Sequence, residues 1–377
     1  MYDPCASILH GSVAFVLGTR REIVKLAPLT GLFADAARVI HTGQHYDARM
    51  SEVFFTDCGM RRPDVTLGVG GMSRAGQVAA AVANLDTLFA AARPAAVVVQ
   101  GDTNSALAGA LAANAYGIPL VHVEAGLRSH DRRMPEENNR TLIDHVSDLL
   151  CAPTRGNVEN LMAERLDPQL VELTGNTVVE ALRQSLPGPQ ARAKVLAEVG
   201  VQAGRYVLAT IHRPENTDDP RVLGAIVAEL EAIGAAGRPV LFPVHPRTRA
   251  ALARVTGGRL AEGLSTCDPL GYREFLALVA ECALVVSDSG GIQEETTVLG
   301  RPLVLVRRST ERPEALADFA CLAEPGPAIS LAAFTLLADI ESVHARLRVL
   351  PSPFGDGRAS FRIRDAMFRR VPGLGAR

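Results

Sequence analysis

Three carboxylates, Asp102, Glu124 and Glu136, are the residues best suited to proton-transfer chemistry. No run of basic residues close to them in the sequence neutralises their charge. Burial beside a ligand raises the pKa of a carboxyl group toward the range in which it exchanges protons near neutral pH. The competing interpretation is that each carboxylate caps a helix or belongs to a structural ion pair.

A second group of residues has the chemistry to bind phosphate. Ser289, Gly290 and Gly291 stand directly before a predicted helix, where small residues let free backbone N–H groups approach an anion. The side chains suited to balancing the charge of a diphosphate are Arg20, His212, Arg213 and Arg312. Arginine favours bidentate phosphate contacts, although any single arginine could instead lie at the surface or pair with a carboxylate.

Two familiar nucleotide-binding motifs do not occur. The sequence contains no GxxxxGK[ST], which excludes a P-loop, and no GxGxxG follows the first predicted strand. The second absence disfavours a nicotinamide dinucleotide as the ligand.

The elements that must position these residues alternate between short apolar strands and longer helices. The predicted strands are Val13–Leu17, Ala96–Gln100, Leu120–Val123, Leu149–Ala152, Leu170–Leu173, Tyr206–Thr210, Pro239–Val244, Ala283–Ser287 and Pro302–Val306. The predicted helices include Ser105–Tyr116, Arg221–Ala236 and Tyr272–Glu281. This alternation is typical of parallel sheets covered on both faces. The stretch Leu186–Arg192 separates two such series, so we expect two doubly wound α/β domains with a cleft between them.

Six of the predicted strands run directly into ionisable or hydroxyl-bearing residues. The segments that follow them are Gly18–Arg20, Gly101–Asn104, Glu124–Arg128, His212–Asn216, His245–Pro246 and Asp288–Gly291. Ligands of such sheets bind at the carboxyl ends of the strands, so we expect these segments to face the cleft. The residues alone therefore predict a diphosphate-bearing small molecule as ligand. They leave a lyase, an epimerase and a glycosyltransferase open.

The composition narrows the class of partner. The 377 residues carry 39 Lys and Arg against 41 Asp and Glu, a formal net charge of −2 that argues against nucleic acid or an acidic membrane surface. The six cysteines form neither a CxxC pair nor a Cys/His zinc pattern, so we expect reduced thiols in a cytoplasmic protein and no metal. We also expect no signal peptide and no membrane span, because no suitable apolar run occurs.

The sequence resembles the non-hydrolysing UDP-N-acetylglucosamine 2-epimerases from Gly18 to about Arg364. The matching phrases, in chain order, are Gly18–Arg20 with Lys25–Pro28, Thr42–His45, Gly101–Thr103, His122–Arg128, Pro135–Arg140, Gly175–Val178, His212–Arg213 with Glu215–Asn216, Pro243–Pro246, Asp288–Glu295, Thr310–Glu314 and Pro353–Gly357. Each phrase is weak by itself, and the ordered set is specific.

The resemblance implies a glycosyltransferase-B-like fold of two Rossmann-like domains. Residues 1–187 would form the first domain, to which a C-terminal helix at about 357–370 returns, and residues 188–356 the UDP-binding domain. The implied reaction is reversible inversion at C2 of UDP-N-acetylglucosamine, giving UDP-N-acetylmannosamine, without cofactor or metal. The implied partners are the UDP-sugar and a second copy of the chain in a homodimer, and the implied pathway makes surface polysaccharide or amino-sugar natural products.

The resemblance also implies roles for individual residues. Proton transfer at C2 is expected from Asp102, Glu124 and Glu136, and His212 is expected to assist departure of the diphosphate. The expected substrate-binding residues are Arg20, Lys25, Arg213, Phe275, Ser289, Gly290, Gly291, Glu295 and Arg312. Among them, Glu295 would hold the ribose and Phe275 would lie beside the uracil. Some bacterial members bind a second substrate molecule as an activator, and the residues that fit that site by position are Gln44, Glu137 and His245.

Three positions depart from the family's usual pattern. Arg21 replaces a usual proline, Asp47 stands near the expected activator site, and Met134 replaces a frequent aromatic residue. The change at Met134 leaves a modified sugar open as the substrate. The alternatives to the epimerase are a hydrolysing relative that releases N-acetylmannosamine and UDP, a glycosyltransferase of the same fold, and a non-catalytic nucleotide-sugar sensor.

Overall fold

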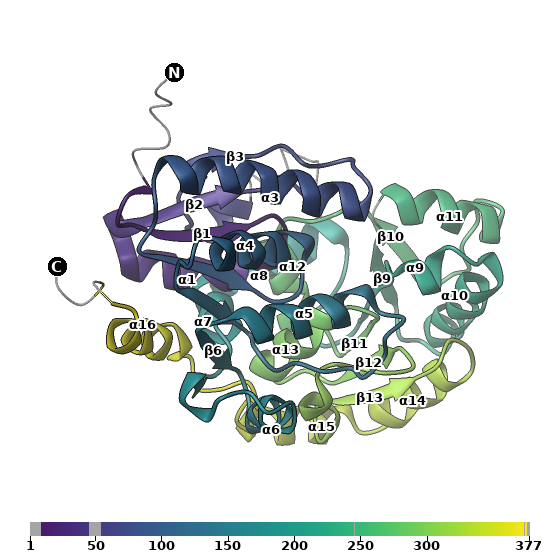
Figure 1. Cartoon of the computed structure of the whole chain (residues 1–377). Coiled ribbons are helices and arrows are strands. Elements are labelled where there is room, and N and C mark those ends of the chain that lie inside the picture. The colour runs from purple at the N-terminus through teal and green to yellow at the C-terminus, as the bar shows by residue number, and fades with distance from the viewer. Residues whose placement is uncertain (1–8, 45–53, 245, 373, 375–377) are drawn as a thin grey trace. The chain divides into compact units, whose positions relative to one another are not determined.

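The computed structural model describes residues 9–44, 54–244, 246–372 and 374 (Figure 1). The chain divides into two compact units, unit 1 (residues 1–184 and 354–377) and unit 2 (residues 185–353). From the sequence, the domain boundary was expected at residues 187 and 188, with the chain returning to the first domain at about 357.

Unit 1 is built on a seven-stranded sheet in the order β3-β2-β1-β4-β5-β6-β7. The strands are β1 (Val13–Leu17), β2 (Ala37–His41), β3 (Val65–Thr66), β4 (Ala96–Gln100), β5 (Leu120–Val123), β6 (Leu149–Ala152) and β7 (Val171–Leu173). Every neighbouring pair is parallel. The strand order reverses between β1 and β4, and such a switch point is where doubly wound sheets bind ligands.

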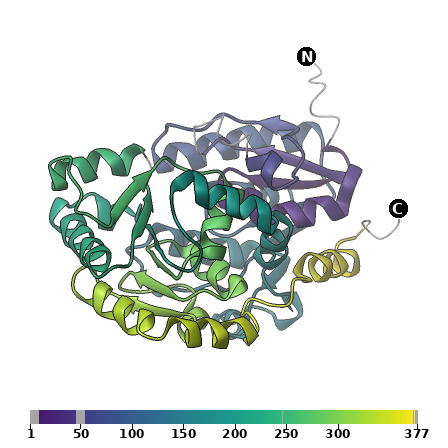
Figure 2. The ribbon, with the colours of Figure 1, turned by 180° about the vertical axis from the view of Figure 1, so that it is seen from behind.

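Helices cover both faces of this sheet. They are α1 (Arg20–Phe33), α3 (Arg74–Ala91), α4 (Asn104–Ala115), α5 (Pro135–Val146), α6 (Arg155–Ala163), α7 (Val178–Ser185) and α16 (Ala359–Arg370), with 3-10 turns η2 (Ala34–Ala36) and η3 (Pro168–Leu170). Successive side chains of a strand point to opposite faces. Accordingly, Val97 and Val99 of β4 join the buried cluster under α3, α4 and α5, while Val98 joins the cluster under α1 and α16. Figure 2 shows α16, in yellow, on the side of α1, which it contacts.

Unit 2 has a six-stranded parallel sheet in the order β10-β9-β8-β11-β12-β13. The strands are β8 (Val207–Thr210), β9 (Val240–Pro243), β10 (Leu264–Cys267), β11 (Leu284–Ser287), β12 (Leu303–Val306) and β13 (Ala320–Ala323). The helices are α8 (Pro189–Val199), α9 (Pro214–Thr217), α10 (Pro220–Ala235), α11 (Pro246–Thr256), α12 (Tyr272–Glu281), α13 (Gly290–Leu299), α14 (Ala328–Leu337) and α15 (Ile340–Val349), with η4 (Pro313–Leu316).

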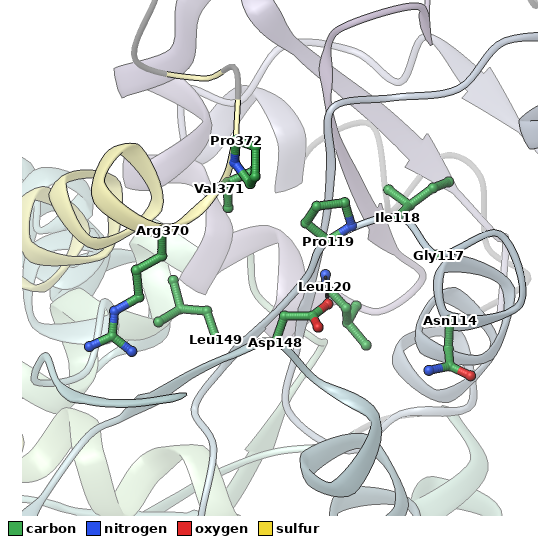
Figure 3. Close-up of a pocket in the computed structure, with 10 residues that line it drawn as sticks. All are labelled: Asn114, Gly117, Ile118, Pro119, Leu120, Asp148, Leu149, Arg370, Val371 and Pro372. Carbon is green, nitrogen blue, oxygen red and sulfur yellow. Dashed lines mark hydrogen bonds between the residues drawn. The ribbon is translucent and has the colours of Figure 1, made fainter. Parts of the chain in front are cut away.

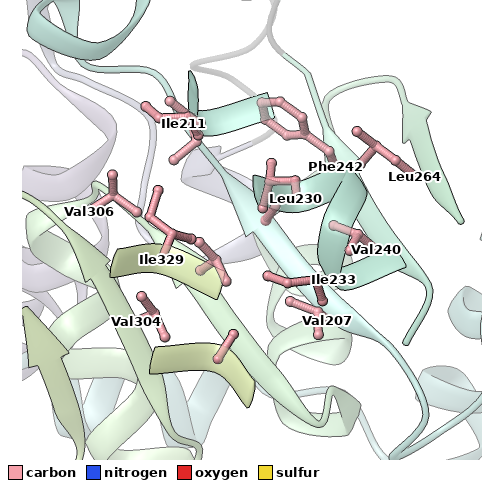
Figure 4. Close-up of a cluster of buried hydrophobic side chains, with 14 of the residues drawn as sticks. Val207, Ile211, Leu230, Ile233, Val240, Phe242, Leu264, Val304, Val306 and Ile329 are labelled. Carbon is pink, nitrogen blue, oxygen red and sulfur yellow. The ribbon is translucent and has the colours of Figure 1, made fainter. Parts of the chain in front are cut away.

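The core of unit 2 again follows strand alternation. Val207 of β8 and Val304 of β12 lie in the buried cluster with Leu230 and Ile233 of α10 and Ile329 of α14 (Figure 4). The opposite face packs against α8, α12 and α13. The predicted fold class is therefore confirmed, with two doubly wound α/β units.

The predicted elements differ from the observed ones mainly in their bounds. The helix predicted at Arg221–Ala236 is α10, which begins one residue earlier at Pro220 and ends at Ala235. The strand predicted at Leu170–Leu173 begins at Val171, because residues 168–170 form the 3-10 turn η3. The predicted returning helix is α16, which begins at Ala359.

Among the described residues, no single helix has both the length and the apolar composition to cross a bilayer. Helices α14 and α15 pass that test only as a pair, and they are bent by 81° from each other.

Candidate functional site

The carboxyl edge of the unit 1 sheet carries two of the three predicted acid/base residues, Asp102 and Glu124. Strand β4 ends at Gln100, which pairs with Val123, the last residue of the neighbouring strand β5. Asp102 and Glu124 therefore follow the ends of two neighbouring strands. Gly101 lies between β4 and Asp102 with a φ of +68°, a left-handed conformation that favours glycine.

Glu124 is buried and held by three side chains. Lys25 Nζ of α1 lies 2.6 Å from Glu124 Oε1, and both side chains are at most 5% exposed. The amide of Asn176 donates to the same oxygen at 3.3 Å, and the amide of Gln100 donates to Oε2. The cation that neutralises this carboxylate thus comes from a helix 99 residues earlier in the chain, not from a neighbouring basic run.

The backbone at Glu124 is strained. Its φ of +73° places a non-glycine residue in the left-handed region, which is costly for a side chain with a Cβ. The backbone N–H groups of Glu124 and Ala125 both donate to the carbonyl of Cys151, at 3.1 Å each. These contacts hold the chain in a sharp turn directly after β5.

Asp102 is bridged to Glu137 by one buried arginine. Arg140 Nε of α5 donates to Asp102 Oδ2 at 3.1 Å, and Arg140 Nη1 donates to Glu137. The Asp102 side chain is 28% exposed, whereas that of Arg140 is 3% exposed. The buried Arg140 therefore orients the Asp102 carboxylate, while the Asp102 side chain stays partly accessible to solvent.

Glu137, one of the residues expected at an activator site, is bonded within unit 1. It accepts hydrogen bonds from the Ser129 backbone and hydroxyl and from the His130 backbone. Burial favours the neutral acid, but the Ser129 N–H and the Arg140 charge outweigh it and keep the pKa of Glu137 below its usual value.

The remaining predicted residues of unit 1 differ in their surroundings. Gln44 Oε1 accepts from the Ser105 N–H at 3.0 Å and from the Ser105 hydroxyl at 2.8 Å. Arg20 is half-buried, with its guanidinium carbon 4.9 Å from the ring centre of Phe54. Glu136 is exposed and makes no hydrogen bond or ion pair with any residue that the structure describes. His245, the third residue expected at an activator site, lies outside the described residues.

Glu22 is a buried carboxyl group that the sequence interpretation missed. It lies in the first turn of α1 and accepts from the N–H groups of Gly18 and Thr19, at 3.0 and 2.8 Å. It also accepts from the hydroxyl of Thr103 at 2.7 Å, next to Asp102. Burial raises the pKa of Glu22 to about 7, against the lowering effect of these hydrogen bonds.

In unit 2, His212 is oriented by a buried aspartate. Asp288 follows β11, is fully buried, and its Oδ1 lies 3.0 Å from His212 Nδ1. Asp288 also accepts from the N–H groups of His212 and Arg213 and from the amide of Asn216. Although burial opposes ionisation, the hydrogen bond from His212 and the others keep the pKa of Asp288 low. His212 therefore donates through Nδ1 and keeps Nε2 for a ligand, and its side chain is 46% exposed.

The predicted phosphate-binding turn begins α13. Ser289 is the residue before the helix and Gly290 is its first residue. The Ser289 N–H donates to the Ser287 hydroxyl at 3.0 Å, which is itself 2.7 Å from the Thr210 hydroxyl. The turn is thus tied to the ends of β11 and β8. The first N–H groups of a helix have no partner within that helix and suit an anion.

Arg312 lies in a buried cluster of charges. Its Nε is 2.7 Å from Glu294 and its Nη1 contacts Glu311, which is also 2.9 Å from Arg307. The guanidinium predicted to balance a diphosphate is therefore already engaged by two carboxylates of unit 2.

The other residues expected to bind substrate are also placed within unit 2. Arg213 pairs with Glu215 at 2.9 Å. Glu295 is buried on α13, and Phe275 of α12 is partly buried against the cluster under α8, α12 and α13.

A cavity of about 250 Å³ lies at the opposite, amino-terminal edge of the unit 1 sheet (Figure 3). It is lined at the starts of β5 and β6 by Leu120 and Leu149, and by Asp148 and Arg370. Asp148 is engaged there by the Leu120 N–H at 2.8 Å. No predicted site residue lines this cavity, so the candidate chemistry belongs to the carboxyl edge. Among the described residues, no group of three His, Cys, Asp or Glu side chains is placed to hold a metal ion.

Two doubly wound units with polar groups at their strand ends define a glycosyltransferase-B-like protein. The same fold is found in a glycosyltransferase from Rickettsia africae ESF-5, with a TM-score of 0.59, 11% identity and coverage of 97% of this chain and 99% of that chain. Residues 34–368 match the sequence model of the family described as UDP-N-acetylglucosamine 2-epimerase, and the chain belongs to this family.

Individual relatives give the extent of the similarity. The UDP-N-acetylglucosamine 2-epimerase of Methanococcus maripaludis is 36% identical, over 94% of this chain and 98% of the relative. The UDP-2,3-diacetamido-2,3-dideoxy-D-glucuronate 2-epimerase of Pseudomonas aeruginosa is 38% identical over 78% of this chain and 83% of the relative. A crystal structure of the Methanocaldococcus jannaschii UDP-GlcNAc 2-epimerase in complex with UDP-GlcNAc and UDP has a TM-score of 0.83 and 34% identity, covering 95% of this chain and 99% of that chain.

Proposed function

We propose that the protein interconverts UDP-N-acetylglucosamine and UDP-N-acetylmannosamine by inversion at C2, without net hydrolysis. Membership of the epimerase family supports the class of reaction. The observation that carries the proposal is the placement of two carboxylates, Asp102 and Glu124, after neighbouring strands at one sheet edge. Asp102 is held by the buried cation of Arg140, and Glu124 by the buried cation of Lys25.

The chemistry of the sugar favours elimination over direct deprotonation. No carbonyl adjoins C2, so its proton is a poor acid and a free carbanion is too unstable. When the bond from C1 to the diphosphate oxygen breaks, its electron pair leaves with UDP. A base takes the C2 proton, and the C2–H electron pair forms the double bond of 2-acetamidoglucal. Re-addition of UDP at C1, with a proton delivered to the other face of C2, completes the inversion.

We assign the proton transfers to Asp102, Glu124 and Glu136. Inversion needs proton-transferring groups on two faces of C2, or one mobile group. Asp102 is partly exposed and Glu136 is exposed, which suits contact with a substrate. Glu124 is buried against Lys25, so it would act from within that ion pair.

The groups of unit 2 would act on the nucleotide. We propose that the start of α13 at Ser289–Gly291 binds the diphosphate and that His212 Nε2 donates to the departing oxygen. Asp288 supports this role because it occupies Nδ1. Arg213 and Arg312 of unit 2 would contribute positive charge, Glu295 would bind the ribose, and Phe275 would lie beside the uracil. Arg20 and Lys25 of unit 1 would add further positive charge.

The further assembly of the protein is also a proposal. We propose a cytoplasmic homodimer that needs no cofactor, with residues 1–187 and the returning C-terminal helix as one domain and residues 188–356 as the UDP-binding domain. A second UDP-sugar at Gln44 and Glu137 would have to replace the hydrogen bonds that both side chains now make.

Nuclear magnetic resonance in heavy water tests the reaction. With UDP-N-acetylglucosamine we expect deuterium at C2 and the appearance of UDP-N-acetylmannosamine. Free N-acetylmannosamine with UDP as the main products would instead indicate the hydrolysing reaction.

The same exchange experiment should be run with UDP-2,3-diacetamido-2,3-dideoxy-D-glucuronate as a second candidate substrate, because the chain is similar to the Pseudomonas aeruginosa enzyme. Exchange only with UDP-2,3-diacetamido-2,3-dideoxy-D-glucuronate would move the proposal to that sugar. Absence of exchange with both sugars would overturn it.

A further inference from the structure

His122 is a fully buried histidine whose two ring nitrogens are both hydrogen-bonded. It lies in β5, two residues before Glu124. Nδ1 is 2.6 Å from Asp144 Oδ1 of α5, and Nε2 is 2.9 Å from the backbone carbonyl of Gly101. The ring therefore connects α5 to the residue that directly precedes Asp102.

The partners of His122 determine its protonation. A backbone carbonyl only accepts hydrogen bonds, so Nε2 must carry a hydrogen. Asp144 also receives the Gly126 N–H at 3.2 Å and lies 2.8 Å from Arg128 Nη1. Burial alone would favour the neutral acid, but the Gly126 N–H and the Arg128 cation favour the ionised carboxylate of Asp144. An ionised carboxylate accepts only, so Nδ1 must carry a hydrogen as well.

The charges around His122 compensate one another. Arg128 is paired on its other side with Glu164, through Nε at 2.6 Å and Nη2 at 2.7 Å. Glu164 is 30% exposed and has His145 Nδ1 at 3.8 Å, while His122 and Asp144 are fully buried. Successive contacts connect Glu164 to Arg128, Arg128 to Asp144, and Asp144 to His122. The charges along this row of side chains alternate in sign, and buried charges are tolerated when they are paired in this way.

The carbonyl that His122 holds belongs to a critical turn. Gly101 donates its own N–H to the Val123 carbonyl at 3.0 Å, and its φ of +68° reverses the chain after β4. His122 and the Val123 carbonyl therefore engage both backbone polar groups of Gly101, the residue before Asp102. A small displacement of a reacting group is costly in rate, because proton transfer needs hydrogen-bond distance.

We infer that His122 is a doubly protonated positioning residue, which holds the Gly101 carbonyl and thereby orients Asp102 for proton transfer. The role in catalysis rests on the proposed epimerase function; the charge state does not. Its test therefore has one readout that needs no activity and one that does.

Nitrogen-15 spectra of protein labelled at histidine test the charge state. We expect both His122 nitrogens in the protonated chemical-shift range near neutral pH, with the signals assigned by their loss in His122→Gln. His344 is a control in the same spectrum: its Nε2 lies 2.7 Å from the Ala283 carbonyl, but its Nδ1 lies 3.1 Å from the cation of Arg301. His344 should show one unprotonated nitrogen. One unprotonated nitrogen at His122 would overturn the inference, whether or not the protein is active.

Two substitutions at His122 test the positioning role. The glutamine amide nitrogen occupies a place near Nε2, so His122→Gln keeps a donor for the Gly101 carbonyl. The asparagine amide reaches only the Nδ1 position, so His122→Asn keeps a donor for Asp144 and loses the other. We expect kcat of His122→Asn to fall at least about tenfold below that of His122→Gln, with KM changed less than about threefold.

Equal kcat in the two variants, or an effect confined to KM, would overturn the positioning role. Circular dichroism and the unfolding midpoint establish that both variants fold. If the unsubstituted protein epimerises neither sugar, the proposed function fails, and the nitrogen-15 result still decides the charge state.

Discussion

Lys25 Nζ and Glu124 Oε1 are 2.6 Å apart, and neither side chain is more than 5% exposed. One residue lies on the first helix of unit 1 and the other follows its fifth strand. Removing a single partner of such a pair leaves an uncompensated charge in the interior. The pair therefore links the stability of unit 1 to the proton transfer proposed for Glu124.

Lys25→Met should destabilise unit 1 by about 3–5 kcal/mol, because Glu124 stays buried without its cation. Urea unfolding followed by far-ultraviolet circular dichroism measures this change. The double variant Lys25→Met/Glu124→Gln should regain part of the loss, since it buries no lone charge. Arg364→Ala, which breaks an exposed pair with Asp365, is the control and should change stability by less than about 1 kcal/mol. Equal effects of Lys25→Met and the control would contradict the importance of the buried pair.

Glu22 should make stability fall as the pH rises through the window between its unfolded and folded pKa values. Burial raises its pKa from 4.5 to about 7, so the folded state binds more protons than the unfolded state between these values. The stabilisation is fully present below pH 4.5 and is lost as the pH rises to about 7, by up to about 3 kcal/mol at about 1.4 kcal/mol per pKa unit.

Glu22→Gln isolates this contribution because glutamine does not titrate. Unfolding midpoints of both proteins, measured across this pH window, give the difference in stability, in which the other carboxylates cancel. We expect the unsubstituted protein to lose stability relative to the variant as the pH rises. A difference that stays constant across the window would show that Glu22 does not titrate there.

Asp288→Asn should lower kcat by about 10- to 100-fold with a smaller effect on KM, because His212 loses the carboxylate that orients its ring. The amide keeps one oxygen acceptor for the backbone N–H groups, so the fold should persist. Steady-state kinetics of epimerisation provides the measurement. Asp219→Asn, at the exposed N-cap of α10, is the matched control and should leave kcat unchanged. A comparable loss in both variants would remove the special role of Asp288.

Asp102→Asn should lower the rate of deuterium entry at C2 by about 100-fold or more while UDP still binds. The amide cannot take a proton, and the proposed UDP contacts come from other residues. Exchange followed by nuclear magnetic resonance, together with calorimetric titration of UDP, separates the two effects. Unchanged exchange would exclude Asp102 as a proton-transferring group.

Much of the fold could be predicted because buried strands are visible in the sequence as short apolar runs. Strand β4, the run Ala96–Gln100, was predicted with its observed bounds. Besides the strands β3 and β13, two further strands, β2 and β10, were missed, since Arg38 interrupts β2 and β10 contains Ser265 and Thr266. Their strand character comes from pairing with β1 and β9, which the local sequence does not reveal.

The site was predictable as a set of strand ends but not as a set of contacts. The spacing of Thr19 and Glu22 is a visible capping box, yet the bond from Thr103 comes from 81 residues away. Arg140, the partner of Asp102, and Asp288, the partner of His212, lie in segments that resemble the family, but the sequence assigned no role to either. Their roles depend on which strands are neighbours, and that order exists only after folding.

The return of the chain to unit 1 sets an order of events during synthesis. Helix α16 supplies Ile363, Ala366 and Met367 to the buried cluster that also contains Ile23 and Leu26 of α1. These side chains leave the ribosome only after all of unit 2 has been made. The first unit to be started is therefore the last to be finished, and a chain released early would expose the apolar face that α16 covers.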